Sequence, residues 1–369
     1  RNKIAHTRTI MSHDPTETGG STAPASQSDP ATLADKPIAW AISGGARGME
    51  NQCLALAEAA GFAPVPLRVA ARAPWRWLPE KAWSLWGKVP SRLSAENRRV
   101  LDGPWPDLVV ACGRQSVPLA IHIKRVSQGR TFVVQCQDPR VTPALFDLVV
   151  PPDHDNVAAA ENVLSIIGSP NLALPWRLAE AADKWAPKFD ALGRPLVAVA
   201  IGGSNSAYRL NRDAIDDMFR CLEKMQAESG AHLAITTSRR TGSDNEELIQ
   251  AHADRLGAWV WDGSGDSPIL GLYACADAIV VTKDSVNMAA EAAASGKPLY
   301  VADLDGSSEK FDHFHDVLKA RGIARSLTHA PLDAWTYTPL TETLRAAQKI
   351  RQRMSDRGFT LPAAPQNGQ

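Results

Sequence analysis

The sequence predicts an α/β protein made of two Rossmann-like domains that follow one another along the chain. Short apolar segments alternate with helical segments, and several of the apolar segments end in glycines. The alternation occurs in two series, separated by residues 175–195. Such a pattern is typical of parallel sheets covered by helices. Ligands of these sheets bind at the carboxyl ends of the strands, so we expect a site in a central cleft that both sheets face.

The first series forms the expected N-terminal domain, residues 37–174. Its expected strands are 37–43, 65–69, 108–112, 130–135 and 148–150, and its expected helices are 51–60 and 117–126. Each strand is a short apolar run, and the helical segments are longer and mix apolar with polar residues. Residues 175–195 are interpreted as a linker with one short helix.

The second series forms the expected C-terminal domain, residues 196–330. Its expected strands are 196–201, 232–236, 258–261, 278–281 and 299–301, and its expected helices are 212–229, 244–256, 268–275 and 285–295. We expect a helix and a tail over residues 331–369.

Residues 1–36 are expected to be a disordered leader, because they are rich in Ser, Thr, Pro and Ala and hold few large apolar residues. The first ten residues contain cations and no acid, a composition shared with transit peptides. A solvated leader, with Met11 as the true start, is the favoured reading.

Charge and cysteine usage exclude several classes of function. Forty basic and forty acidic residues cancel, so the overall charge gives no reason to expect nucleic acid as a partner. The five cysteines are scattered and mostly lie in apolar runs, which indicates buried thiols in a reducing, cytoplasmic location. No Cys/His spacing of a zinc site is present, and we expect neither a metal nor a cofactor. The sequence has no run of about 18 apolar residues, so we expect no membrane-spanning helix.

Three strand-to-helix turns of the first domain carry polar residues that we expect to face the cleft. The glycines of the first turn let the backbone approach a ligand closely, although such glycines also serve only to fit a helix against a sheet. The expected cleft residues are Gly44, Gly45, Arg47, Gly48, Asn51, Gln52, Arg114 and Gln137. Asp138 follows a buried strand directly and is the candidate general base, with a turn cap as its alternative role.

Two turns of the second domain carry residues that could contact an anion. The first combines glycines with serines after an apolar strand, and the second combines hydroxyls with two arginines. The residues expected to contact an anion are Gly202, Gly203, Ser204, Ser238, Arg239 and Arg240. A solvated basic turn is the alternative for the arginines.

A third turn of the second domain runs from an apolar strand through TKDS directly into a helix. Free N–H groups and the positive end of a helix dipole make such a turn suitable for a phosphate. Its candidate residues are Lys283, Asp284, Ser285, Asn287, Met288 and Glu291. Ser285 can accept from helix N–H groups, and Glu291 can accept both hydroxyls of a ribose; an ordinary exposed glutamate is the alternative.

A tryptophan-rich segment precedes residue 92. Trp75, Trp77, Trp83 and Trp86 lie among six cations and a single acid. This composition is typical of a helix at a membrane surface, which favours a peripheral membrane contact. Tryptophans buried in a core are the alternative.

Longer motifs identify a family. SGGARGMENQ, PDLVVACGRQSVPLA, VVQCQDPR, IGGSN, TTSRRT, WDGSGDSPILGLYACADAIVVTKDSVNMAAEAAASGKPLYV and KFDHFHDVLKARGIAR resemble the "elongated mitochondria" family of mitochondrial fission proteins. The resemblance covers about residues 38–327, and members of this family are similar to GT-B glycosyltransferases. Gly45 and Met49 depart from the pattern of the first loop, where an acidic and often a polar residue are expected.

The resemblance implies a GT-B fold with the acceptor side of the cleft, including the cleft residues named above, in the N-terminal domain and the nucleotide donor in the C-terminal domain. Ser285 would then face the diphosphate and Glu291 the ribose, and Gly203 and Ser204 would line the donor phosphates. The implied activity moves a sugar from a nucleotide-diphosphate sugar to a lipid-linked or cell-envelope acceptor without a metal. The alternative is a non-catalytic protein that keeps the scaffold to bind the fission machinery.

Overall fold

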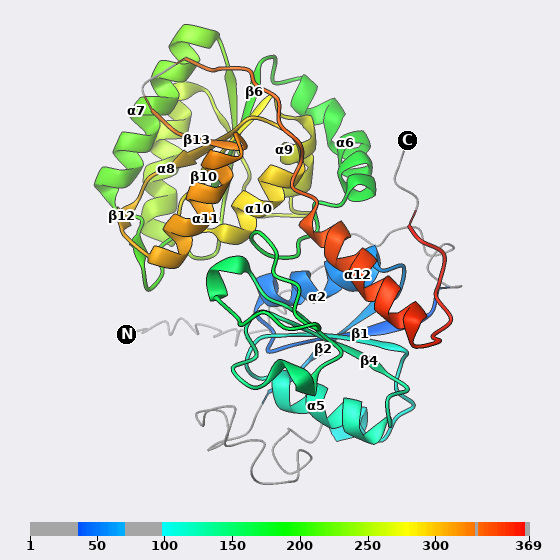
Figure 1. Ribbon diagram of the computed structural model, residues 1–369. Coiled ribbons are helices and arrows are strands. Elements are labelled where there is room, and N and C mark those ends of the chain that lie inside the picture. Colours follow the sequence, from blue (N-terminus) through cyan, green and yellow to red (C-terminus); the bar gives the residue numbers. More distant parts are fainter. Residues whose placement is uncertain (1–35, 71–97, 329–330, 366–369) are drawn as a thin grey trace, which may run out of the picture.

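The computed structural model describes residues 36–70, 98–328 and 331–365, and these form two α/β domains (Figure 1). The predicted leader, except for Lys36, and the four tryptophans of the predicted membrane segment lie outside the described residues. Each domain has a parallel sheet with helices on both faces, which confirms the predicted fold class.

The N-terminal sheet has the strand order β2-β1-β3-β4-β5, and all of its strands are parallel. The strands are β1 (Ile38–Ser43), β2 (Ala63–Arg68), β3 (Leu108–Cys112), β4 (Phe132–Cys136) and β5 (Leu148–Val150). Helices α2 (Arg47–Ala59) and α12 (Glu342–Asp356) cover one face, and α5 (Val117–Val126) covers the other. Strands β3, β4 and β5 are buried along their whole length, as expected of a sheet covered on both sides.

The C-terminal sheet has the order β13-β11-β10-β6-β8-β9 and is also parallel. The strands are β6 (Leu196–Ile201), β8 (His232–Thr237), β9 (Trp259–Val260), β10 (Ala278–Thr282), β11 (Leu299–Ala302) and β13 (Ala324–Ser326). Helices α6 (Pro175–Asp190), α9 (Ile269–Cys275), α10 (Val286–Ala294) and α11 (Glu309–Ala320) pack on one face. Helices α7 (Arg212–Ser229) and α8 (Ser243–Leu256) pack on the other.

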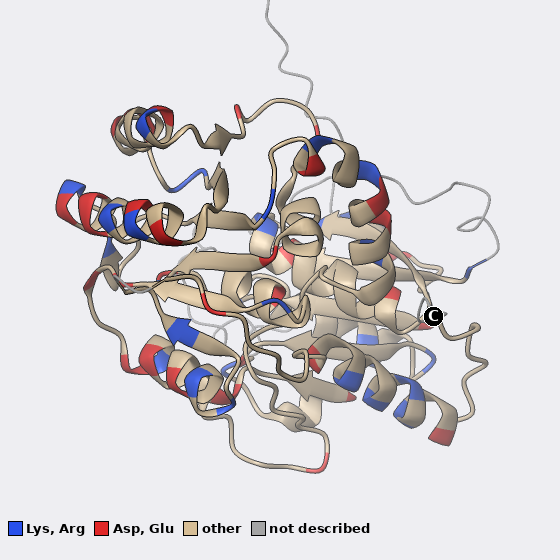
Figure 2. Cartoon of the chain, turned by 90° about the horizontal axis from the view of Figure 1, so that it is seen from above, with Lys and Arg blue, Asp and Glu red and all other residues tan. Residues whose placement is uncertain are grey.

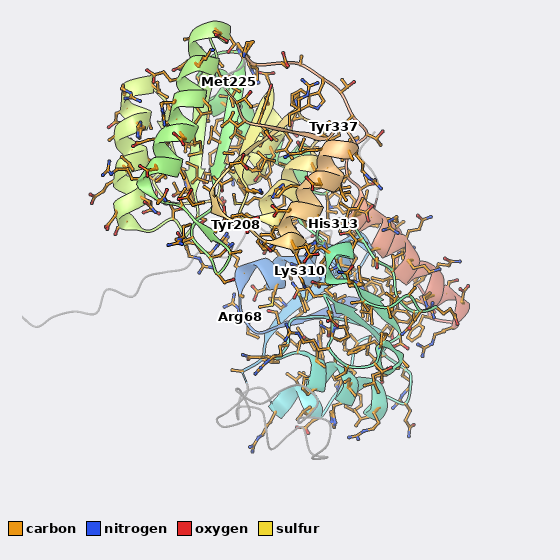
Figure 3. All side chains as sticks on the ribbon, turned by 60° about the vertical axis from the view of Figure 1, so that its left-hand side comes forward. Arg68, Tyr208, Met225, Lys310, His313 and Tyr337 are labelled. Carbon is orange, nitrogen blue, oxygen red and sulfur yellow. The ribbon has the colours of Figure 1, made fainter. Side chains whose placement is uncertain are left out.

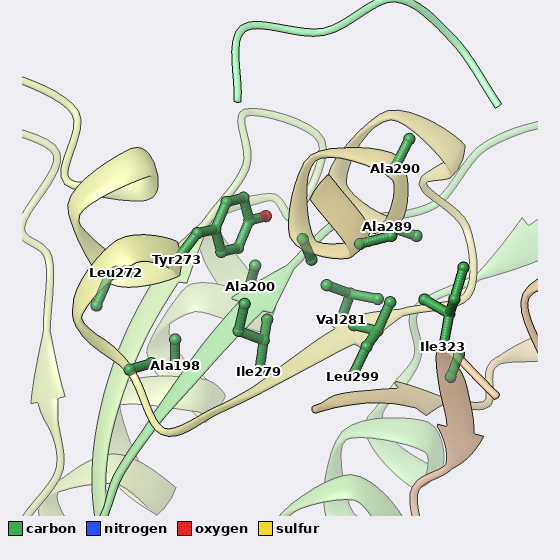
Figure 4. Packing of buried hydrophobic residues seen from close by; sticks show 14 of the residues in the cluster. Ala198, Ala200, Leu272, Tyr273, Ile279, Val281, Ala289, Ala290, Leu299 and Ile323 are labelled. Atoms are coloured by element: carbon green, nitrogen blue, oxygen red, sulfur yellow. The ribbon is translucent and has the colours of Figure 1, made fainter. Parts of the chain in front are cut away.

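Helix α10 approaches its sheet closely because its buried residues are all alanines. Ala289 and Ala290 lie above Ile279 and Val281 of β10, as Figure 4 shows. Beside them, the buried Tyr273 of α9 points its hydroxyl toward α10 and donates to the carbonyl of Met288 (3.4 Å). This packing holds the first turn of α10 at the carboxyl end of β10.

Two predicted elements differ in extent from the observed ones. Helix α2 begins at Arg47, four residues before the expected start, so Arg47 and Gly48 are helical residues and not loop residues. Helix α6 has sixteen residues and is not the short helix that was expected in a linker. Its Trp185 lies against α9, where a Cβ on Gly271 would be 2.4 Å from the indole. This tertiary contact stabilises α6, and no local sequence signal reports it.

Short elements complete the C-terminal domain. Strands β7 (Tyr208–Arg209) and β12 (Asp305–Gly306) form a small antiparallel pair that the sequence did not predict. Strand β13 and the 3-10 turn η5 (Asp153–Asp155) were also not predicted. Of these, β7 and η5 matter for the site, because β7 carries Tyr208, which contacts Asp312, and η5 carries Asp155, which pairs with Lys310 of the other domain.

The chain returns to the N-terminal domain at its end, where α12 packs on α2 (Figure 1). Arginines on α12 donate to backbone carbonyls of N-terminal loops: Arg345 to Ser165 (2.6 Å) and Arg353 to Glu161 (2.8 Å). Arg357 pairs with the buried carboxylate of Asp147. These contacts tie the end of the chain to the N-terminal domain.

Charges of both signs are interspersed on the helices seen in Figure 2. All five cysteines are buried and free of disulfides, as predicted. Within the described residues, no helix is both long enough and apolar enough to cross a membrane.

Candidate functional site

The carboxyl ends of the two sheets face each other, and the first turns of α2 and α10 meet between them. A Cβ built on Gly48 of α2 would lie only 2.7 Å from Nδ2 of Asn287 on α10. Gly48 therefore leaves space for the side chain of Asn287. The structure thus brings predicted residues of the acceptor side and of the donor side into contact, and we call this region the interdomain junction.

Helix α10 begins as its sequence predicted. The hydroxyl of Ser285 accepts from the backbone N–H of Met288 (3.3 Å), which confirms Ser285 as the N-cap. The side chain of Met288 packs against the hydrophobic core of the domain. The first turn of α10 therefore presents its N-terminal amides and the positive end of its dipole to the junction.

Glu291 lies one turn further along α10 than Asn287, on the face toward the N-terminal domain. Its side chain is only partly exposed, and desolvation raises the pKa of its carboxyl from 4.5 to about 7. The charge of Arg47, at the start of α2, acts in the opposite direction and lowers this pKa. A guanidinium of the N-terminal domain therefore acts electrostatically on a carboxyl of the C-terminal domain, and this carboxyl changes charge near neutral pH.

Asp284 fills the space that the glycines of the IGGSN turn leave open. A Cβ on Gly202 would lie 2.3 Å from its carboxylate oxygens. The N–H of Gly203 donates to Asp284 Oδ2 (3.1 Å), and the N–H of Gly202 donates to Thr282 Oγ1 (2.7 Å). These two amides are used inside the protein, so the turn does not offer them to a phosphate in this conformation.

The neighbouring turn, after β8, supplies Arg240 and Arg239. Arg240 pairs with Asp284 (Nη2 to Oδ2, 2.7 Å), and its backbone N–H donates to Ser238 Oγ (3.2 Å). Arg239 is exposed. In the IGGSN turn, Ser204 is also exposed, and its hydroxyl accepts from the backbone N–H of Leu210 (3.0 Å).

Lys283 extends away from α10 toward α11. Its ammonium pairs with Asp312 (2.9 Å) and lies 5.8 Å from the centre of the Tyr208 ring. The hydroxyl of Tyr208 donates to the same carboxylate (3.2 Å). Lys283 is thus held by an acid of its own domain, and a ligand phosphate would have to compete with Asp312 for it.

The glycine turn after β1 is more open than the IGGSN turn. A Cβ on Gly44 would make only ordinary contacts of 3.6 Å or more with Gln115, and Gly45 has a φ of +87°. Asn51 lies on the second turn of α2, and Arg114 is exposed in the turn between β3 and α5. A methyl group would therefore fit at Gly44 without a clash, whereas none fits at Gly202 or Gly203.

A chain of side-chain amides connects the two domains through Gln52, which is buried. Its Oε1 accepts from Nε2 of Gln137 (3.2 Å) and from the thiol of Cys112 (3.3 Å). Its Nε2 lies 3.5 Å from Oδ1 of Asn287, at the long end for a hydrogen bond. The hydroxyl of Ser169 donates to the same Oδ1 (2.5 Å).

Asp138 is exposed, and its Oδ1 accepts from the N–H of Arg140 (2.8 Å). The alternative role that the sequence left open, a turn cap, is therefore present. The N–H of Asp138 donates to Asp155 (3.3 Å), which also pairs with Lys310 of α11 (2.9 Å). Lys310 and His313 lie on the side of α11 nearest the N-terminal domain (Figure 3).

Two cavities lie away from the junction. One, of about 470 Å³, lies between α2, α12 and residues 361–365, and the other, of about 300 Å³, lies beside Asp147. Neither is lined by a predicted site residue. Among the described residues, no group of three or more His, Cys, Asp and Glu side chains could hold a metal ion.

Sequence comparison assigns the family. The profile described as "Mitochondrial fission ELM1" matches residues 47–354, a span that includes every residue of the junction named above except Gly44 and Gly45. The chain belongs to the mitochondrial fission ELM1 family. It is similar to the mitochondrial fission protein ELM1 of Arabidopsis thaliana, with 32% identity over 295 residues, 72% of this chain and 67% of that protein. An uncharacterized protein of Rickettsia prowazekii is 27% identical over 290 residues, 68% of this chain and 81% of the other.

Solved structures confirm the GT-B fold of this ELM1-family protein. A UDP-N-acetylglucosamine 2-epimerase superposes with a TM-score of 0.53 at 11% identity, covering 89% of this chain and 98% of the epimerase. The UDP-GlcNAc 2-epimerase of Methanocaldococcus jannaschii gives a TM-score of 0.52 at 9% identity, covering 86% and 99%. At such identities the likeness shows the fold alone.

Sequence reasoning missed several residues of the junction in this ELM1-family chain. They are polar residues that lie outside the glycine-rich turns: Cys112, Asp155, Ser169, Thr282 and Lys310. Only Ser169 had a usable signal, because it lies in a Gly-Ser-Pro turn. The others look like ordinary core or helix-surface residues.

Proposed function

We propose that this protein is a GT-B glycosyltransferase that binds a nucleotide-diphosphate sugar at the interdomain junction. It would transfer the sugar to a lipid-linked or cell-envelope acceptor. The fold supports a nucleotide sugar as the ligand class, since the M. jannaschii epimerase of the same fold was crystallised with UDP-GlcNAc and UDP.

The observation that carries the proposal is the desolvated carboxyl of Glu291, on which the charge of Arg47 acts from the other domain. A desolvated carboxyl at the junction of two domains is costly for a fold, and such groups cluster at functional sites. When ionised, Glu291 can accept two hydrogen bonds, which matches the adjacent 2′- and 3′-hydroxyls of a ribose. Arg47, from the acceptor-side domain, is placed to pair with a phosphate or with Glu291 itself.

The donor diphosphate is assigned to the first turn of α10. Ser285 caps this helix, and the N-terminal amides and dipole favour an anion. Gly202 and Gly203 use their N–H groups inside the protein. We therefore assign diphosphate binding to the first turn of α10, Ser204 and Arg239, and not to the glycine amides. The leaving diphosphate charge is offset by these groups in the proposal, and no metal or other cofactor is invoked.

The acceptor is assigned to the open glycine turn around Gly44 and Gly45. Asp138 remains the candidate base, although one of its oxygens caps a turn in this structure. To act as a base, its carboxylate would have to come within about 3 Å of the acceptor hydroxyl.

Thermal unfolding with a panel of nucleotides and nucleotide sugars tests the proposal. A ligand at about 100 times its Kd stabilises the folded state by roughly 2.7 kcal/mol, enough for a clear rise in Tm. We expect at least one nucleoside diphosphate to raise Tm in the wild type and to raise it less in Glu291→Ala. Release of nucleoside diphosphate from the stabilising sugar, in the presence of lipid-linked acceptors, then tests catalysis.

The alternative function is a non-catalytic interaction protein that retains the GT-B scaffold. The internal use of Gly202 and Gly203 favours it, because a nucleotide site commonly relies on such amides. A full nucleotide panel without any rise in Tm would support this alternative. Capture of fission-machinery proteins by the purified chain would then be the next measurement.

A further inference from the structure

The loop that follows β4 has an unusual backbone. Gln137 and Arg140 have φ values of +66° and +54°, a region that residues other than glycine rarely adopt. Such conformations persist only where the surroundings hold them, and they cluster at functional sites. We call residues 137–140 the β4 loop.

Two sets of contacts hold the β4 loop, and both lead to the C-terminal domain. The Gln137 side chain donates to Gln52, whose own amide reaches Asn287 on α10. The Asp138 backbone donates to Asp155, which pairs with Lys310 on α11. A loop of the N-terminal domain is thus tied to the two helices that line the C-terminal side of the junction.

Gln52 is the central member of the first set. It is 3% exposed, and both ends of its amide are used, so it cannot turn without breaking a contact in one of the domains. A buried amide that loses a partner pays the desolvation cost of that group, so the position of Gln52 responds to both neighbours. Ser169 fixes Asn287 from a third direction, which limits the positions that Asn287 can adopt.

We propose that Gln52 is a positioning residue that couples helix α10 to the β4 loop. When a ligand occupies the first turn of α10 and shifts Asn287, the contact between Asn287 and Gln52 changes. The hydrogen bond between Gln52 and Gln137 then changes as well. The assignment of the donor to α10 and of the acceptor to the N-terminal domain rests on the proposed function, whereas the coupling does not. In terms of that function, donor occupancy sets the geometry of the loop that carries the candidate base Asp138.

Hydrogen exchange at the backbone amides of Gln137, Asp138 and Arg140 reports on the loop without any ligand. We expect Asn287→Ala, in the other domain, to speed their exchange at least fivefold. In a Gln52→Met background the link from Asn287 to Gln137 is already broken, so adding Asn287→Ala should change exchange of the loop less than twofold. Asn287→Asp keeps an oxygen that accepts from Gln52 and Ser169, and we expect it to restore slow exchange.

Gln226→Met is the matched control, because Gln226 donates to the Leu256 carbonyl far from the junction. It should leave exchange of the β4 loop unchanged even if it lowers Tm. A merely structural role for Gln52 predicts that the effects of Gln52→Met and Asn287→Ala multiply. The coupling would be overturned if the effects of the two substitutions on exchange multiply, or if Asn287→Ala leaves exchange of the β4 loop unchanged.

The same measurement with UDP separates this inference from the proposed function. If UDP binds the wild type, we expect it to slow exchange of the β4 loop in the wild type and not in Gln52→Met. UDP that binds both proteins and protects the loop equally in both would overturn the coupling. Failure of every nucleotide to bind would count against the proposed function alone, since the ligand-free comparison still decides the coupling.

Discussion

Arg240 and Asp284 form an ion pair in which only the arginine reaches solvent. The Nη2–Oδ2 distance is 2.7 Å, and the two side chains are 44% and 0% exposed. Asp284 also binds the N–H of Gly203 and the hydroxyl of Thr282 (2.6 Å). The buried Asp284 carboxylate therefore holds the IGGSN turn in place. A ligand phosphate could bind Arg240 only by weakening the Arg240–Asp284 ion pair.

Replacing Asp284 should destabilise the C-terminal domain. In Asp284→Ala, Arg240 can turn to solvent, but the Gly203 N–H is left buried without its partner. We expect a loss of about 2 to 3 kcal/mol in the free energy of unfolding, measured by urea denaturation. Arg239→Ala is the control, because the exposed Arg239 should change stability by less than about 0.5 kcal/mol. Equal effects of the two substitutions would contradict the assigned role of Asp284.

The two glycine turns should respond differently to alanine. A Cβ on Gly203 would lie 2.1 Å from the backbone carbonyl oxygen of Arg240, so Gly203→Ala should cost about 2 kcal/mol or more. Gly44→Ala meets only Gln115 at ordinary distances and should cost less than about 1 kcal/mol. If a ligand approaches the open turn, Gly44→Ala should still weaken its binding. Comparing Tm with ligand affinity for both variants checks this, and a stable Gly203→Ala protein would refute the packing argument.

The Glu291 carboxyl should make stability depend on pH. Its pKa is about 7 in the folded protein and ordinarily 4.5, so between these values the folded state binds a proton that the unfolded state has lost. Its contribution to stability is complete below about pH 4.5 and is lost as the pH rises to 7. We expect the Tm of Glu291→Gln to rise relative to the wild type from pH 5 to pH 8. A constant difference in Tm over this range would show that the carboxyl is not desolvated.

If Glu291 binds a ribose, its effect should depend on the sugar hydroxyl. For the wild type we expect 2′-deoxy-UDP to bind about tenfold more weakly than UDP, since hydrogen bonds to a charged group contribute about 1.5 to 3 kcal/mol. In Glu291→Ala the two nucleotides should bind within twofold of each other. Titration calorimetry measures both ratios. An undiminished preference for UDP in the variant would place the ribose elsewhere.

Local sequence signals were sufficient for most elements. The predicted bounds of β3, β6, α5 and α7 agree with the observed ones, because these segments have clear apolar periodicity and end at glycines or turns. The cap at Ser285 was predictable for the same reason, since an N-cap bonds within three residues of itself. The early start of α2 was not predictable, because Ala46 is a poor N-cap and the glycine motif resembles a loop.

The sequence by itself determined two series of strands and helices, the family, and the turns that carry the polar residues. Only the tertiary structure decided what those residues do. Glycines that could have contacted a phosphate instead accommodate Asp284 and the backbone of Arg240, and the charge of Arg47 acts on Glu291 from the other domain. The physical reason is the range of the forces involved: helix caps and periodicity act over a few residues. Burial and ion pairing instead depend on groups hundreds of residues apart, which become neighbours only when the two domains pack.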